Sequence, residues 1–154
     1  MRYAVRLLTL CLLLSPGALA HAAGGLDKSV LLDDQALQQL AQRAEQANPR
    51  EQCFLYTELV SAMTERAGKQ LLDGDADQAS ATLKKVAEYA RLIHMNLARD
   101  TKRLKNAEML MHRTTYRLNE YLHNASTEDK PTLQATLQQL SQVQNELLTQ
   151  VFSH

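Results

Sequence analysis

The 154-residue chain has few of the residues that build loops, disulfides and cofactor sites. It contains no tryptophan, two cysteines, three prolines and five glycines. Neither a glycine-rich phosphate loop nor a Cys-x-x-Cys-His motif occurs, which excludes a nucleotide site of that type and covalent haem attachment. Because loops carry most catalytic groups and this chain has hardly any loop signals, we expect no enzymatic activity and no catalytic residues.

The charges of the chain balance overall but are distributed unevenly. Basic and acidic side chains number 17 each, so the composition demands neither a nucleic acid nor an anionic membrane, and we expect no nucleic-acid partner. Residues 84–117 hold nine basic and three acidic side chains, a net charge of +6. Residues 23–83 carry a net −5 and residues 118–154 a net −3.

The beginning of the chain has the features of a cleavable export signal. Arg2 and Arg6 lie before an apolar run at 7–14, and Ser-Pro-Gly follows that run. Small residues then create two sites of the kind that signal peptidase accepts, so we expect cleavage after Ala20 or Ala22. The apolar run is shorter than the roughly 20 residues that span a bilayer.

Removal of this signal leaves one domain and one thiol. We predict a signal peptide over 1–22, a single helical domain over 23–154, and export to the periplasm or the extracellular space without a transmembrane anchor. Cys53 is then the only cysteine, so no intramolecular disulfide forms. Apolar and aromatic neighbours at 54–56 predict that its thiol is buried; a bridge to another chain is the alternative.

The longest segment without helix breakers predicts one long helix. Between Gly74 and Pro131 lie 56 residues with neither glycine nor proline, and apolar residues recur there with a period of seven. We expect a helix over 75–124, ~75 Å long at 1.5 Å per residue. A break near Arg99-Asp100-Thr101-Lys102 would instead give a compact bundle, and this alternative stays open. The predicted seam consists of Ala76, Ala79, Leu83, Val86, Ala90, Ile93, Leu97, Asp100, Leu104, Ala107, Met111, Thr114, Leu118, Tyr121 and Ala125.

Three shorter segments complete the predicted fold. The first covers 26–47, and Asn48-Pro49 then caps and starts a second helix that stops at Asp73-Gly74-Asp75. The last helix follows the capping-box pattern Ser126-Thr127-Glu128-Asp129. Short connections make sequential helices antiparallel neighbours. The predicted fold class is all-α: an elongated antiparallel helical hairpin or bundle of about four helices with one long central coiled-coil-like helix.

A stretch rich in histidine and methionine, HMNLARDTKRLKNAEMLMH, raises the question of a metal site. Glu108, Met109 and His112 are the best candidate ligands, because they are three and four residues apart on one predicted helix. Without a ligand from another helix they form a weak site, and methionine fills helical cores routinely. We expect no metal and no cofactor; carriage of a metal or small ligand in the bundle core is the alternative function.

Two sets of residues are candidates for binding another macromolecule. The basic residues of the long helix either pair with flanking acidic helices or present a basic face to an acidic partner. Four apolar residues form either an edge that a second copy of the chain covers or part of the chain's own core. The basic candidates are Arg99, Lys102, Arg103, Lys105 and Arg113, and the apolar candidates are Leu110, Leu122, Leu148 and Phe152.

Two resemblances accompany these patterns. Leu71-Leu72-Asp73-Gly74-Asp75 is similar to the turn of a tetratricopeptide repeat, but it occurs once, and a solenoid needs about three copies. The segments REQCFLYTELV, ATLKKVAEYARLIH, TKRLKNAEMLMHRTTYRL and ELLTQVF resemble a group of uncharacterised secreted all-helical proteins of acidobacterial type. That resemblance implies a bacterial, exported protein and brings no activity, cofactor or catalytic residue with it.

The function that fits these features is binding rather than catalysis. We expect a non-enzymatic, secreted or periplasmic helical protein that acts through protein–protein interaction or self-association, with a homodimer as one form of the latter.

Overall fold

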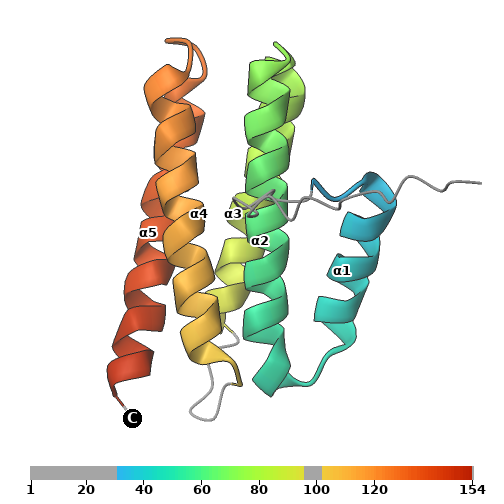
Figure 1. Ribbon diagram of the computed structural model, residues 1–154, viewed down its shortest axis with the longest axis vertical. Coiled ribbons are helices and arrows are strands. Elements are labelled where there is room, and N and C mark those ends of the chain that lie inside the picture. The colour runs from blue at the N-terminus through green and yellow to red at the C-terminus, as the bar shows by residue number, and fades with distance from the viewer. Residues whose placement is uncertain (1–30, 96–101, 154) are drawn as a thin grey trace, which may run out of the picture.

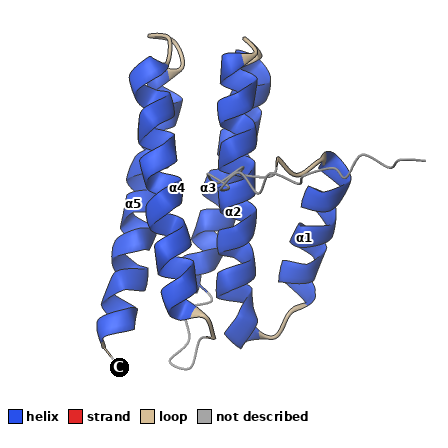
Figure 2. Ribbon diagram, in the orientation of Figure 1, coloured by secondary structure: helices blue, strands red, loops and turns tan. Residues whose placement is uncertain are grey.

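Five α-helices make up the part of the chain that the structure, a computed structural model, describes: residues 31–95 and 102–153 (Figures 1 and 2). They are α1 (Asp34–Gln46), α2 (Pro49–Leu72), α3 (Ala76–Met95), α4 (Leu104–Asn124) and α5 (Lys130–Phe152). No strand occurs in these two ranges, so the predicted all-α class is confirmed. The predicted signal peptide over 1–22 and its cleavage sites lie outside the described residues.

The helices form two antiparallel hairpins that stack side by side, with α1 attached to one of them (Figure 1). The α2–α3 hairpin packs on the α4–α5 hairpin through two seams, α2 against α4 and α3 against α5, and α1 packs against α2. Two ion pairs show that α2 and α4 run parallel. Glu51 pairs with Lys102 near the beginnings of the two helices, and Glu65 pairs with Arg117 further along both. Such stacking is found in helical-repeat proteins, although the described residues hold two hairpins rather than the three or more of a solenoid.

The single long helix that the heptad pattern predicts over 75–124 is corrected to two helices. α3 ends at Met95 and α4 begins at Leu104. Before α4, the backbone N–H of Lys102 donates to the carbonyl of Arg50 at 2.8 Å, and Arg103 has a left-handed φ of 58°. A left-handed residue other than glycine cannot continue a helix and costs roughly 1–2 kcal/mol. These ends agree with the alternative of a break near 99–102, whose residues Arg99, Asp100 and Thr101 lie outside the described ranges.

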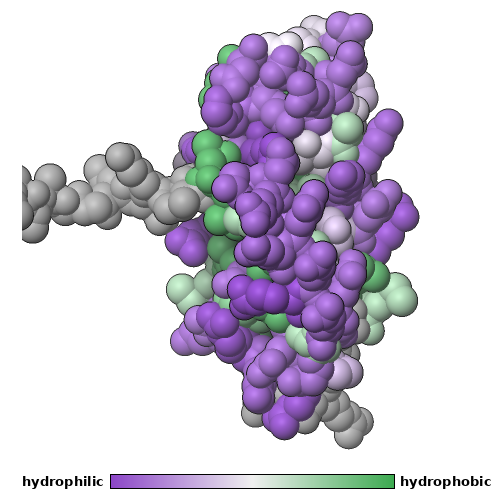
Figure 3. All heavy atoms as spheres, turned by 90° about the vertical axis from the view of Figure 1, so that its right-hand side faces the viewer, coloured by the Kyte–Doolittle hydropathy of each residue, from purple (hydrophilic) through white to green (hydrophobic). Residues whose placement is uncertain are grey.

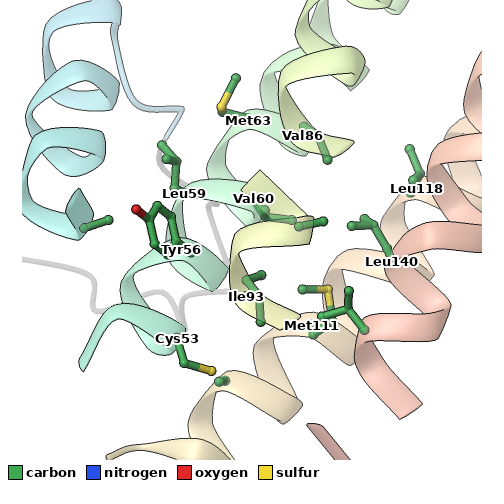
Figure 4. Packing of buried hydrophobic residues seen from close by; sticks show 14 of the residues in the cluster. Cys53, Tyr56, Leu59, Val60, Met63, Val86, Ile93, Met111, Leu118 and Leu140 are labelled. Atoms are coloured by element: carbon green, nitrogen blue, oxygen red, sulfur yellow. The ribbon is translucent and has the colours of Figure 1, made fainter. Parts of the chain in front are cut away.

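The correction changes the shape that we expected but leaves the buried seam almost intact. Leu83, Val86, Ile93, Met111 and Leu118 are all buried, on both sides of the break. The side chains of Val86, Ile93, Met111 and Leu118 point into a common interior together with Val60 of α2 and Leu140 of α5 (Figure 4), and Leu83 belongs to the same buried cluster. Among the predicted seam positions in the described ranges, Ala76 is exposed and Leu104, Tyr121 and Ala125 are half-buried, while Leu97 and Asp100 lie outside those ranges. The molecule is therefore a bundle of five helices in the described ranges, not an elongated assembly of about four.

The helix ends follow local capping chemistry. The carboxylate of Asp33 accepts a hydrogen bond from the Ala36 N–H at 2.7 Å, which starts α1 at Asp34, later than the predicted residue 26. Asn48 caps α2 by accepting from the Arg50 N–H at 3.0 Å, as predicted. Gly74 has a φ of +84° in the turn between α2 and α3, which glycine adopts without strain. The Ser126 hydroxyl accepts from the Asp129 N–H at 3.2 Å, one turn before α5 begins.

The surface on the side of α1 is mostly hydrophilic, with apolar residues in small separate patches (Figure 3). None of the helices in the described ranges combines the length and the apolar composition that a membrane crossing requires.

Two methionines in α4 test the register of the bundle. Met111 is 0% exposed and Met109 is 57% exposed. We expect Met111→Asp to lower the free energy of unfolding by more than about 3 kcal/mol, since it removes a buried apolar side chain and adds a buried charge. Met109→Asp, the matched control, should change it by less than about 0.5 kcal/mol. Urea denaturation measures both, and equal losses would show that this face of α4 is assigned wrongly.

Candidate interaction site

A network of four polar side chains joins α2 to α4. The Tyr121 hydroxyl donates to Glu65 Oε2 at 2.7 Å, and Arg117 Nε donates to Glu65 Oε1 at 3.1 Å. Arg117 also donates to Glu120 Oε2 at 2.6 Å and to the Tyr121 hydroxyl oxygen at 3.0 Å. Arg117 and Glu65 therefore form a clamp across the seam, with Tyr121 beneath it.

A glycine in the middle of α2 makes this network possible. A Cβ atom at Gly68 would lie 2.1 Å from Cζ of Tyr121, far inside van der Waals contact. Glycine, which has no Cβ, lets the Tyr121 ring come this close to α2. Glycine in a helix interior costs roughly 0.5–1 kcal/mol relative to alanine, so the ring contact and the hydrogen bond of Tyr121 must offset that cost.

Two members of the network, Tyr121 and Arg117, have raised pKa values. Burial, followed by the hydrogen bond to Glu65, raises the pKa of Tyr121 to about 12, so the phenol stays a neutral donor at neutral pH. Hydrogen bonds to Glu65 and Glu120 raise the pKa of Arg117 further above its ordinary value. Each group has a structural partner, so the network is suited to holding two helices together rather than to proton transfer.

A groove lies along the α2–α4 seam on one side of this clamp. Its volume is about 770 Å³, and its walls come from α2, α4 and the residues before α1. Half-buried Leu32, Ala62 and Leu110 give it an apolar floor. Tyr116, 61% exposed, stands on its rim. The remaining lining residues are Glu58, Ser61, Glu65, His112, Arg113, Thr114 and Arg117. We call this hollow the seam groove.

A second hollow lies on the other side of the clamp, where the two hairpin turns meet. Its volume is about 630 Å³. Gly68, Leu71 and Tyr121 line it, as does Leu72, which is 78% exposed. The remaining lining residues are Gly74, Ala76, Arg117, Glu120, Asn124, Ala125, Ser126, Glu128 and Asp129. We call this hollow the end cleft.

Two of the basic residues that the sequence offers as interaction candidates have partners within the chain. Lys102 Nζ lies 3.1 Å from Glu51 Oε1. The guanidinium carbon of Arg103 lies 3.4 Å from the centroid of the Phe54 ring, so its side chain covers that ring. The Lys102–Glu51 contact supports the interpretation that the basic segment pairs with carboxylates of a flanking helix, whereas Arg103 lies on an aromatic ring.

The other basic candidates lie on α4 or outside the described residues. Arg113 lines the seam groove, and Lys105 is exposed nearer the start of the helix. Arg99 lies outside the described residues.

The four apolar candidates are not brought together. Leu110 is half-buried in the seam groove, and Leu122 packs against the core. Leu148 is 39% exposed and Phe152 is 80% exposed, both in the last turns of α5. The four residues therefore do not form the single apolar edge that the sequence suggested. Of the four, only Leu110 lines the seam groove.

The histidine and methionine residues are distributed over different faces. His112 and Met109 are exposed on α4 and Glu108 is half-buried beside them. His94 is on α3, and its Nδ1 lies 2.5 Å from Glu146 Oε2 of α5. The described residues contain no group of three or more histidine, cysteine, aspartate or glutamate side chains that could hold a metal ion.

The sequence did not single out Glu65, Gly68, Tyr116 or Tyr121 as site residues. The heptad position of Tyr121 predicts that it lies in the seam, and in the structure it contacts α2. The pattern does not predict the hydrogen bond that its hydroxyl donates to Glu65. The one available signal is Gly68, a lone glycine within a helical pattern, which often marks close packing.

No protein-family model, curated protein or solved structure shows a significant match to the chain.

The contact between Gly68 and Tyr121 is tested by a double-mutant cycle. We expect Gly68→Ala to lower the free energy of unfolding by about 1–3 kcal/mol, because the new methyl group expels the ring. In a Tyr121→Ala background the same change should raise it by up to about 1 kcal/mol, since alanine then gains its helix propensity. A loss of equal size in both backgrounds, measured by urea denaturation, would contradict the contact.

Cys53 is buried and unreactive by geometry. It is 0% exposed, and burial raises the pKa of its thiol to about 12. Because the thiolate is the reactive form, the folded protein of residues 23–154 should not react with Ellman's reagent at about pH 8, whereas the same chain unfolded in urea should react fully. Fast labelling of the folded protein would show that the residue is accessible.

Proposed function

We propose that this chain is an exported, non-enzymatic helical protein that acts by binding another protein, and that it binds through the α2–α4 face. The observation that carries this proposal is the seam groove, an apolar floor of half-buried residues between two parallel helices. Segments of partner proteins dock in such grooves through a few apolar anchors, while the polar rim sets orientation.

Two exposed apolar side chains extend this face. Met109 and Tyr116 are both more than half exposed and are seven residues apart on α4, so they lie on the same side of that helix. Aromatic residues, methionine and arginine are enriched at protein interfaces. The rim also carries Glu58 and Arg113, charges of both signs, so it favours a protein segment over a polyanion.

The clamp supports the proposal because it keeps the groove in shape. Arg117 and Glu65 line the groove and are fixed by each other. A preorganised groove spends less binding free energy on ordering its own side chains. The resemblance to exported helical proteins of acidobacterial type adds a bacterial source and secretion to the proposal, and it adds no catalytic role.

Affinity capture with two matched variants tests the proposal. We expect proteins enriched by the wild-type chain from an extract of its host to be lost with Tyr116→Asp and retained with Gln138→Asp, which places the same charge on α5 away from the seam. Native mass spectrometry of residues 23–154 separates the other possibilities. A dimer that Tyr116→Asp dissociates would identify the partner as a second copy, and a stoichiometric small-molecule or metal mass would favour the carrier function instead. Equal retention by both variants would contradict a role for the α2–α4 face.

A further inference from the structure

The end cleft has a different character from the seam groove, because the charge around it has one dominant sign. Residues 69–77 and 117–130, which form this end of the two hairpins, contain six acidic and three basic side chains. Two of the three cations are already engaged: Lys69 is paired with Asp73, and Arg117 with Glu65 and Glu120. The carboxylates of Asp75, Asp77 and Glu128 make no ion pair within the described residues.

Helix stabilisation explains part of this charge and not the rest. Asp77 lies in the first turn of α3, where a carboxylate interacts favourably with the positive end of the helix dipole. Stabilisation of the helix end does not explain why a leucine, Leu72, is 78% exposed at the cleft. Nor does it require a hollow of about 630 Å³ that Gly68, Leu71 and the Tyr121 ring help to line.

We propose that the end cleft binds a cationic amphipathic segment of a protein partner. An apolar side chain of the partner would lie against Leu72 and the Tyr121 ring. Lysine or arginine residues on either side of it would face Glu128 and the carboxylates of the α2–α3 turn. Opposite charges around an apolar centre give specificity and fast association. This inference rests on the proposed function, since it names the chemistry of the partner that the α2–α4 face receives at one end.

A fluorescently labelled helical peptide of leucine and lysine is the probe. Its affinity for residues 23–154 is measured by fluorescence anisotropy, with a leucine–glutamate peptide of the same length as the negative control. We expect Leu72→Ser and Glu128→Lys each to raise the Kd about tenfold or more. Both residues are exposed, so the thermal melting curve should not move. Glu58→Lys, the same charge change in the seam groove, should alter the Kd by less than about twofold.

Two outcomes would overturn the inference. One is that Glu58→Lys weakens binding as much as Glu128→Lys, which would mean that only net charge matters. The other is that the leucine–glutamate peptide binds as tightly as the lysine peptide. If either occurs while partner capture still depends on Tyr116, the end cleft is not the docking site but the α2–α4 face remains the binding face. If peptide binding does not depend on the end cleft and partner capture does not depend on Tyr116, the proposed function itself is contradicted.

Discussion

The parallel packing of α2 against α4 is the contact on which the rest of the structure depends. Parallel neighbours place like ends of two helix dipoles side by side, and opposite charges across the seam offset this. Lys102 and Arg103 attach the start of α4 to Glu51 and Phe54, and further along Arg117 meets Glu65. Among the helices of the described ranges, α1 packs its backbone against α2, and the α2–α4 and α3–α5 seams hold the two hairpins in one bundle.

The sequence predicts what is local and periodic in this fold. Burial follows the heptad register in both α3 and α4, since each helix turns one apolar face to the core, and the caps at Asn48 and the turn at Gly74 follow from residue chemistry. The sequence favours a straight helix over a break between α3 and α4, because neither glycine nor proline marks the break. It is stabilised by contacts of Lys102 and Arg103 with residues some 50 positions earlier, which no local pattern reveals. The same holds for Gly68 and Tyr121, whose pairing exists only once the hairpins stack.

The proposed binding role follows from how this seam is built. A single clamp of Arg117 and Glu65 contributes to the walls of the seam groove, and its arginine also lines the end cleft. The sequence leaves open whether the charged segments pair with one another or form an exposed charged face. In the structure, some of the charged side chains pair and others do not. Lys102 before α4 and Arg117 within it pair with carboxylates of α2, whereas Glu128, which lines the end cleft, makes no ion pair within the described residues. Cys53, the only cysteine of the described residues, is buried in the core.

The central claim, that α4 folds back along α2 instead of continuing α3, is tested most directly by small-angle X-ray scattering on residues 23–154. A bundle of stacked hairpins with this number of residues has a radius of gyration of about 14 Å, slightly more if the terminal segment extends. A molecule built on one continuous helix of ~75 Å requires a radius of gyration above about 20 Å. The lower value is the result that the packing of α2 on α4 predicts, and the higher value would contradict both the seam and the binding face built on it.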